Sequence, residues 1–400
     1  MRAPLAAAVL LVVAAIGVGV APASLQVVAA NETADEDAPI YRIAHLTLGD
    51  DGSAGLTNQS IDAASAVSIG RDDAAARLED YATAERLNRT DDTNATLDGV
   101  IDDFEARVAT LEADERSVRR QHANGSTSAR QFVHDVAHVQ ARSARLEDRL
   151  AHLEETAARY GNDTHRDRIN RLERRLLGYT GPVRERALDA VIGRDSLALY
   201  AAGSDRGTVL AVLDGGEYVR EAYRADRQAE SPDGISFLAA LDRFEELYPV
   251  AVTFSGQVSA KGLNGRNKTY QIEKLLPFGS LLVLLDGNTR YTFYEVQRRQ
   301  LGSMDQPASV TATANGTRLV VNRTHVGGPL RIATYDADGR PTAAAVRVGD
   351  RRVGTGEDGV VWTLMPPESR VEVTATTPDG TVSLAVEPVA FTPVNGTSGS

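Results

Sequence analysis

Two nine-residue stretches, GTVLAVLDG at residues 207–215 and GSLLVLLDG at residues 279–287, decide the predicted fold of the central part of the chain. Each is an apolar run of strand length that ends in Asp-Gly, a pair favoured at tight hairpin turns. Strand-like sequence follows each run, at residues 217–223 and 290–296. The two stretches therefore predict two β-hairpins.

The segments that precede the two hairpins also resemble one another. A helix is expected to begin at Pro182, because proline suits the first turn of a helix, and a strand follows at 197–200. A helix over 235–247 and a strand over 250–255 precede the second hairpin in the same order. The sequence therefore predicts a duplicated helix-strand-hairpin α+β domain over residues 182–301.

Residues 71–178 have the pattern of long amphipathic helices. Over 97–118, and again over 132–160, apolar residues recur at alternating steps of four and three, which is the spacing of a coiled-coil seam. Ser128 and the Gln three residues later fit a capping box at the start of the second helix. We expect an antiparallel helical hairpin or coiled coil here, as a spacer or oligomerisation element.

Residues 308–390 alternate strand-like segments with turn signals, as an all-β sandwich does. The segments are PLRIATYDADG at 329–339, RPTAAAVRV at 340–348, GTGEDG at 354–359, VVWTL at 360–364 and RVEVTA at 370–375. They resemble a carboxypeptidase-regulatory-like, transthyretin-like or Ig-like β-sandwich of exported proteins. The resemblance implies a structural or adhesive module without catalytic residues.

The two ends of the chain differ from these domains. Residues 1–30 combine a cationic start, a long apolar run and small residues before Asn31, which predicts a signal peptide or, failing cleavage, an N-terminal membrane anchor. Either alternative places the rest of the chain outside the cell. Residues 31–70 are expected to form a polar tether with one possible strand at 41–48, and residues 391–400 a polar tail.

The composition limits the chemistry and the environment of the protein. The chain has no cysteine, which excludes disulfides, thiolate metal sites and thiol catalysis. Of its 43 basic residues only Lys261, Lys268 and Lys274 are lysines, and the net charge is −12. This composition resembles exported proteins of extreme halophiles. In molar salt the Debye length falls to about 3 Å, so the acidic surface would solvate the protein and would not steer partners.

The asparagines give the clearest functional signal. The chain has 13 asparagines, and ten of them head an Asn-x-Ser/Thr triplet, whereas chance would place about two in that context. The ten are Asn31, Asn58, Asn88, Asn94, Asn124, Asn162, Asn267, Asn315, Asn322 and Asn395. We predict that this set is used for N-glycosylation and that its members are exposed, because glycans are bulky.

The run HDVAH at residues 134–138 is one methylene away from the zinc-protease pattern HExxH. On a helix His134 and His138 share a face and could reach one zinc ion. However, Asp135 is shorter than the required Glu, no third ligand motif follows, and the heptad places both histidines away from the apolar seam. We therefore expect a solvated helix face and no metal site.

Other possible sites have simpler explanations. Residues 336–339, Asp-Ala-Asp-Gly, could open a calcium loop, but Arg340 and Pro341 break the pattern, so a β-turn is expected. The arginines between Arg166 and Arg175 could bind an anionic glycan or an acidic partner, although an exposed helix face balanced by nearby acids is the simpler expectation. The chain contains no GxSxG elbow and no GxxxxGK[ST] phosphate loop.

Together these patterns predict a multidomain α+β protein with an N-terminal helical hairpin or coiled coil, a central duplicated α/β module and a C-terminal β-sandwich. Its layout resembles a family of exported haloarchaeal surface glycoproteins. We expect a non-enzymatic extracellular or cell-surface protein with a structural, adhesive or interaction role, no catalytic residues, no metal and no cofactor. The expected partner is a protein or a surface glycan, with a homo-oligomer possible through the coiled coil, and nucleic acid is not expected. The alternatives are an extracellular ligand-binding sensor or accessory subunit acting through residues 182–301 and, less favoured, an exported hydrolase.

Overall fold

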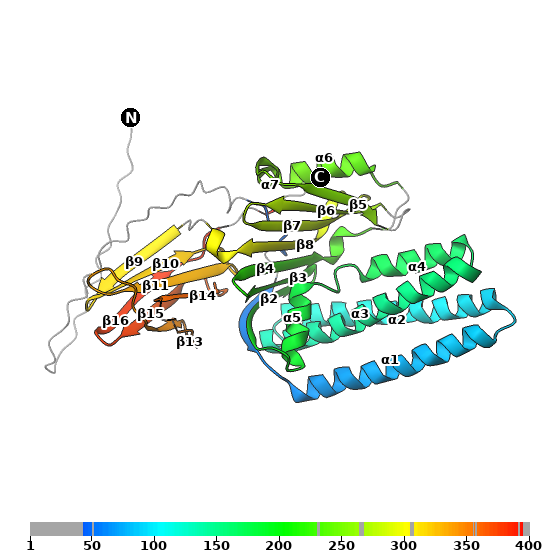
Figure 1. Cartoon of the computed structure of the whole chain (residues 1–400), viewed down its shortest axis with the longest axis horizontal. Helices are drawn as coiled ribbons and strands as arrows, with labels where there is room; N and C mark the ends of the chain where they lie inside the picture. Colours follow the sequence, from blue (N-terminus) through cyan, green and yellow to red (C-terminus); the bar gives the residue numbers. More distant parts are fainter. Residues whose placement is uncertain are drawn as a thin grey trace.

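The computed structural model of the chain is a mixed α+β structure in which helices dominate the first half and antiparallel β-sheets follow (Figure 1). It describes residues 43–49, 52–229, 233–263, 268–304, 308–354, 356, 358–390 and 393–394. The predicted signal peptide or anchor at 1–30 lies outside these ranges. No helix within them has both the length and the apolar character needed to cross a membrane.

The helices and strands follow in chain order. The helices are α1 (Ala63–Arg89), α2 (Thr93–Ala123), α3 (Ala129–Tyr160), α4 (Asp163–Leu176), α5 (Pro182–Val191), α6 (Phe237–Leu247) and α7 (Pro249–Thr253). The strands of the central sheet are β1 (Ser53–Gln59), β2 (Leu197–Ser204), β3 (Gly207–Asp214), β4 (Glu217–Arg224), β5 (Val258–Leu263), β6 (Thr269–Leu276), β7 (Gly279–Asp286) and β8 (Tyr291–Gln300). The strands of the C-terminal sandwich are β9 (Ala308–Ala314), β10 (Thr317–Arg323), β11 (Pro329–Tyr335), β12 (Ala345–Val348), β13 (Arg351–Arg352), β14 (Val360–Leu364), β15 (Val371–Thr377) and β16 (Gly380–Val386).

The central sheet has eight antiparallel strands in the order β1-β2-β3-β4-β8-β7-β6-β5. Both predicted hairpins are present, and their last strands, β4 and β8, pair at the centre of the sheet. The turns differ. Gly215 and Gly216 both have positive φ, as a two-residue hairpin turn requires. In the second hairpin Asp286 instead stabilises a longer loop, because its Oδ1 accepts the N–H groups of Asn288 and Thr289 at 2.8 and 3.0 Å.

The predicted duplication does not extend beyond the hairpins. In β7, Leu281 and Val283 pack against α6, whereas Leu284 belongs to the core that contains α5 residues. Because neighbouring side chains of a strand point to opposite faces, α5 and α6 cover opposite faces of the sheet. The predicted strand at 250–255 is also wrong: α7 occupies most of it, and β5 and β6 supply strands that the sequence pattern did not predict.

The predicted polar tether is incorrect for two segments. Residues 53–59 form β1, which pairs over its whole length with residues 197–203 of β2 at the edge of the sheet. Residues 43–48 are almost entirely buried on the face of the sheet that carries α6, and Val394 of the predicted tail donates its N–H to the carbonyl of His45 at 2.8 Å. Both segments find their apolar contacts far along the chain, which local composition does not reveal.

Helices α1–α4 form a bundle that packs against the other face of the sheet, so it is not an isolated coiled-coil stalk. Its core joins seam residues of α2 and α3 to strand residues such as Leu199 and Leu210. The helical part begins at Ala63, before the predicted residue 71. Helix α1 buries only Ile69 and is tied to α3 by ion pairs such as Arg145 Nε to Asp73 Oδ1 at 2.8 Å.

The C-terminal unit is a β-sandwich of two four-stranded sheets, β14-β11-β10-β9 and β13-β12-β15-β16. Alternate residues of both sheets, among them Val321, Ile332 and Val373, fill the core between them. Strand β14 packs on β2 and β3, so the sandwich is attached to the edge region of the central sheet (Figure 1). This attachment creates the site described next.

Candidate functional site

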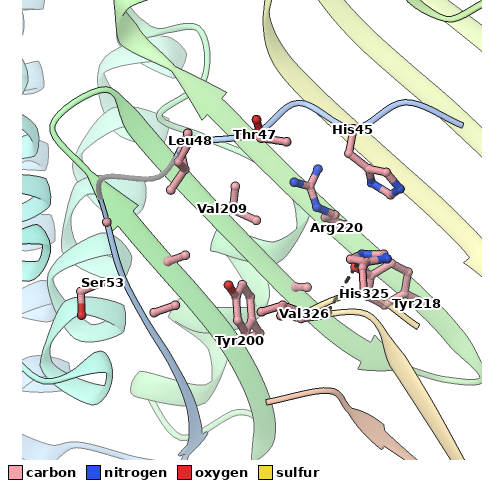
Figure 2. A pocket seen from close by; sticks show the side chains of 16 residues that line it. His45, Thr47, Leu48, Ser53, Tyr200, Val209, Tyr218, Arg220, His325 and Val326 are labelled. Carbon is pink, nitrogen blue, oxygen red and sulfur yellow. Dashed lines mark hydrogen bonds between the residues drawn. The ribbon is translucent and has the colours of Figure 1, made fainter. Parts of the chain in front are cut away.

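A cavity of about 190 Å³ lies where the 43–49 segment, the central sheet and the sandwich meet (Figure 2). One wall of the cavity is formed by Tyr200 of β2, Val209 of β3, and Tyr218 and Arg220 of β4. The loop between β10 and β11 contributes His325, and the early segment contributes His45. Three parts of the chain that are far apart in sequence therefore line one site.

The β10–β11 loop can approach the sheet only because one of its residues is glycine. Gly327 has φ +73°, and a Cβ built on it would lie 2.6 Å from the ring of Tyr200. Its N–H donates to the carbonyl of Met365 at 2.9 Å, and its own carbonyl accepts the Tyr218 hydroxyl at 3.2 Å. The loop is thus fixed between the sandwich and the sheet.

A buried carboxylate organises the polar groups behind the cavity. Glu295 on β8 accepts at Oε1 from Arg220 Nη1 (2.9 Å) and Gln297 Nε2 (3.0 Å), and at Oε2 from the Leu46 N–H (2.9 Å) and the Tyr248 hydroxyl (2.7 Å). Burial raises the pKa of Glu295, while the charge of Arg220 opposes this effect. Four donors and one opposite charge are what a buried carboxylate needs to remain ionised.

Two arginines of β4 hold the backbone of the early segment. Arg220 Nη2 donates to the Leu46 carbonyl at 2.6 Å, and Arg224 Nη1 donates to the Thr47 carbonyl at 2.5 Å. Figure 2 shows the Arg220 side chain next to this segment, in the region between Thr47 and His45. Side chains therefore satisfy the carbonyls of a segment that joins no strand ladder at this point.

Two histidines face each other across the junction. The rings of His45 and His325 lie 4.6 Å apart between centroids, and the side chains are only 1% and 6% exposed. The Tyr218 hydroxyl lies 3.4 Å from His325 Nε2. Burial lowers the pKa of both histidines well below 6.5, and the positive charges of Arg220 and Arg299 lower it further. Both rings are therefore neutral at pH 7.

The contacts among these groups connect separate parts of the chain. Most of their hydrogen bonds join one chain segment to another, and the burial of Tyr200 and Tyr218 raises the pKa of each phenol to about 12. Within the described ranges no three His, Cys, Asp or Glu side chains are grouped so as to hold a metal ion. The geometry supports a junction that fixes the sandwich and the early segment to the sheet.

The predicted solvated face at HDVAH is only partly solvated. His134 is buried, and its Nε2 lies 3.1 Å from Oε1 of Gln59 on β1, while His138 remains half-buried. The heptad pattern located one apolar partner of α3 correctly but could not show that β1 and α5 cover a second side. His134 thus has a structural partner, and burial lowers its pKa.

Most of the predicted glycosylation sites that the structure describes are accessible. Exposed asparagines are Asn58, Asn88, Asn94, Asn124, Asn162 and Asn315. Asn322 does not meet the expectation of exposure: it lies in β10 between two neighbouring strands, is 7% exposed, and accepts from Arg331 Nη1 at 3.3 Å. Asn31, Asn267 and Asn395 lie outside the described residues.

The two remaining predicted features also have defined environments. Asp336 Oδ1 accepts the N–H groups of Asp338 and Arg340 at 2.9 and 2.8 Å, which is a turn and leaves no open calcium loop. The arginine-rich helix is not a free basic face, because Arg168 binds Glu105 and two aspartates of α2, and Arg175 binds Glu112.

The residues of the junction were not predicted from the sequence. His45, Arg220, Glu295 and His325 are isolated in sequence and match no motif. The sequence of β4 and β8 contains one weak indication of the junction. Arg220 and Glu295 are charged, yet the apolar alternation places them on a buried face of the sheet. A charged residue at such a position requires a partner, but the sequence does not identify it.

The comparisons with known proteins divide the chain into three parts. Residues 1–196 are similar to a domain of unknown function (DUF7096), and residues 199–305 to a family of unknown function (DUF7094). Residues 308–384 match the archaeal fibronectin-III type-like domain. No curated protein and no solved structure matches the chain. The third match, together with the two packed sheets, supports an archaeal Ig-like β-sandwich at the C-terminal end of the chain.

Proposed function

We propose that this protein is exported, N-glycosylated and non-enzymatic, and that it acts at the surface of a halophile as a structural or interaction module. One observation carries the proposal. Of the seven Asn-x-Ser/Thr asparagines that the structure describes, six are exposed. An asparagine must be accessible to carry a bulky glycan, so this distribution is the one that glycosylation requires.

The exposed sites are spread over the molecule and are not confined to one loop. Asn58 lies on the edge strand of the sheet, Asn162 caps α4, and Asn315 lies at the β9–β10 turn. At Asn162 it is Oδ1 that accepts the His165 N–H, so the cap does not use Nδ2, the atom to which a glycan is attached. Glycans at these positions would cover the sheet edge, the bundle and the sandwich.

The junction around Glu295 supports a structural role. Its hydrogen bonds connect the early segment to β4 and β8, and the β10–β11 loop lies against the same sheet. A protein of this construction holds its helical bundle and its sandwich in a fixed relation. In this proposal the bundle acts as spacer and the sandwich as the interaction domain, with a protein or surface glycan as partner.

Glycopeptide mass spectrometry of the protein recovered from the surface of a halophilic host tests the proposal. We expect glycan mass on peptides that contain Asn88, Asn94, Asn124 or Asn162, because these side chains are exposed on the bundle. The peptide with Asn322 provides a control within the same chain, since its triplet is intact but its side chain is buried.

The same experiment reads the mature N-terminus and therefore tests export by a cleaved signal peptide. Bare asparagines at all six exposed sites on surface-exposed protein would contradict the proposal. Modification of Asn322 alone would show that exposure in the folded chain does not select the sites.

A second candidate function is that of a ligand-binding sensor or accessory subunit acting through residues 182–301. The observation in its favour is a cavity on the bundle-covered face of the central sheet that is lined by both apolar and polar side chains. This cavity is distinct from the His45–His325 junction, which lies on the other face.

A further inference from the structure

The cavity of about 460 Å³ lies between α3, the beginning of α5 and strands β6–β8. Its size falls within the range of small-molecule sites, about 300–1,000 Å³. Apolar side chains such as Leu282 and Val296 form part of the wall. The polar side chains that line the cavity include Gln140, Glu147, Thr180, Glu185, Glu273, Tyr294 and Arg298.

Tyr294 presents an unused hydroxyl at this wall. The side chain is 6% exposed, and its hydroxyl makes no hydrogen bond to any described residue. The hydroxyl lies against Gly181, where an added Cβ would come within 2.3 Å of it. Burial raises the pKa of this phenol well above 10, so it remains a donor. The hydroxyl oxygen is not among the fully buried polar atoms that lack a partner, so it is open to the cavity, where water or a ligand can satisfy it.

Gln140 offers a second unused donor. Its Oε1 accepts the Gly181 N–H at 3.1 Å, and this contact fixes the orientation of the amide. Its Nε2 group then has no acceptor among the residues that the structure describes. Both donors therefore lie beside Gly181, at one end of the cavity.

Glu147 on α3 supplies the acceptor. Its Oε1 accepts the Thr180 hydroxyl at 3.0 Å. Burial raises the pKa of this carboxyl to about 7; Thr180 and Ser143 oppose the shift, and the carboxylates of Asp148 and Glu173 add to it. A nearby positive charge would remove most of this penalty, because it favours the ionised form.

The charge of the lining favours a cationic ligand. Of the described residues that line the cavity, three are glutamates, namely Glu147, Glu185 and Glu273, and one is an arginine. That arginine, Arg298, already donates to Glu217 at 2.9 Å.

The start of α5, which could otherwise attract an anion, is occupied by the protein's own carboxylate. Glu221 Oε2 accepts the N–H groups of Val183 and Arg184 at 2.9 and 3.3 Å. An anionic ligand therefore has no free helix end to approach here.

We propose that this cavity binds a small organic molecule with a protonated amine, with Glu147 as the counter-ion and Tyr294 and Gln140 as donors to its polar groups. The site suits a protein in molar salt. Exposed charges are screened over about 3 Å at that ionic strength, whereas a half-buried ion pair is screened much less. Recognition by contact inside a cavity remains effective where long-range attraction does not.

Titration calorimetry on the full chain in molar KCl provides the test, with 4-aminobutan-1-ol as the probe and butane-1,4-diol as its neutral analogue. We expect the amine to bind and the diol to bind at least about tenfold more weakly. Glu147→Gln should weaken binding of the amine by about tenfold or more, because it removes the counter-ion. Glu154→Gln is the matched control, since it removes an exposed carboxylate from the same helix outside the cavity.

Two further measurements keep the proposal falsifiable if Glu147→Gln fails to fold. Tyr294→Phe retains the ring and removes only the hydroxyl, and should weaken amine binding severalfold, by roughly the net worth of one hydrogen bond. In the wild-type chain the affinity should fall about tenfold between pH 8 and pH 6, as Glu147 takes up a proton. Equal binding of the diol and the amine, unchanged affinity in both variants, or an affinity independent of pH would overturn the proposal. The glycosylation experiment is independent of each of these outcomes.

Discussion

Replacing Arg220 by leucine should lower the free energy of unfolding by about 3–5 kcal/mol and release the 43–48 segment from the sheet. Glu295 is fully buried, and Arg220 is its charged partner at 2.9 Å. Without Arg220 the carboxylate either remains charged in an apolar environment or takes up a proton, and both states are costly. The Leu46 carbonyl also loses its donor.

The chain contains a probe for this effect. Its single tryptophan, Trp362, lies on β14 and packs against the cluster that contains Leu46, Tyr200 and Tyr218. Urea unfolding followed by Trp362 fluorescence therefore reports the junction between sandwich and sheet directly.

Arg340→Leu is the matched control for Arg220→Leu. It removes an ion pair with Asp338 in which both side chains are more than 70% exposed, and exposed pairs contribute about 0–1 kcal/mol. Equal urea midpoints of unfolding for Arg220→Leu and Arg340→Leu would show that the junction does not depend on the buried ion pair of Arg220 and Glu295.

Acidification should weaken the same junction through His45 and His325. Burial and the nearby arginines hold both folded-state pKa values below 6.5, so below that pH the unfolded chain binds more protons than the folded chain. Above pH 6.5 the two histidines do not change the free energy of unfolding with pH. Below pH 6.5 they lower it progressively as the pH falls. Two such groups give a slope of up to about 2.7 kcal/mol per pH unit.

Other buried groups must be separated from this effect. Burial also lowers the pKa of His122 and His134, which act in the same direction, whereas three buried carboxyls act in the opposite direction. Burial raises the pKa of Glu147, Glu221 and Glu295, so these carboxyls stabilise the fold as the pH falls. The quantity to compare is therefore the change in the free energy of unfolding per pH unit, measured for the wild type and for the double variant His45→Gln/His325→Gln.

We expect that double variant to have a clearly smaller acid sensitivity of the Trp362 signal than the wild type between pH 6.5 and 5, with His122 and His134 contributing to what remains. The control is His152→Gln, at an exposed position on α3, which should behave as the wild type. If the double variant retained the wild-type slope, the two buried histidines would not be the acid-sensitive groups of the junction.

Local patterns predicted the elements of this fold well. The four-three spacing located α2 and α3, and both Asp-Gly hairpins formed. Of the predicted capping box at α3 only half is present: Ser128 accepts the N–H of Gln131 at 3.2 Å, but the Gln131 side chain donates to Asp135 instead of reaching back. These features depend on residues that are close in sequence. The sandwich strands were predictable for the same reason, since alternation and turn residues recur within each short segment.

The relations between elements could not be predicted in this way. The burial of His134 depends on Gln59, and the burial of Leu46 on Glu295, a residue 249 positions later. No periodicity connects such residues. The family matches do not reveal these relations either. Their boundary at residues 196–199 falls at the start of β2 and so separates β1 from the strand with which all seven of its residues pair.

The position of the bundle between β1 and β2 has a consequence for how the chain assembles. The contacts of α1–α4 with one another lie within about 120 residues and can form early, and their core is completed when β2 and β3 pack on it. In contrast, β1 has no strand partner until β2 is made, and Leu46 must wait for β8. His45 meets Pro393 almost at the end of the chain. The first residues of the folded body are therefore among the last to reach their final positions, and a truncated or stalled chain would leave this early segment exposed and apolar.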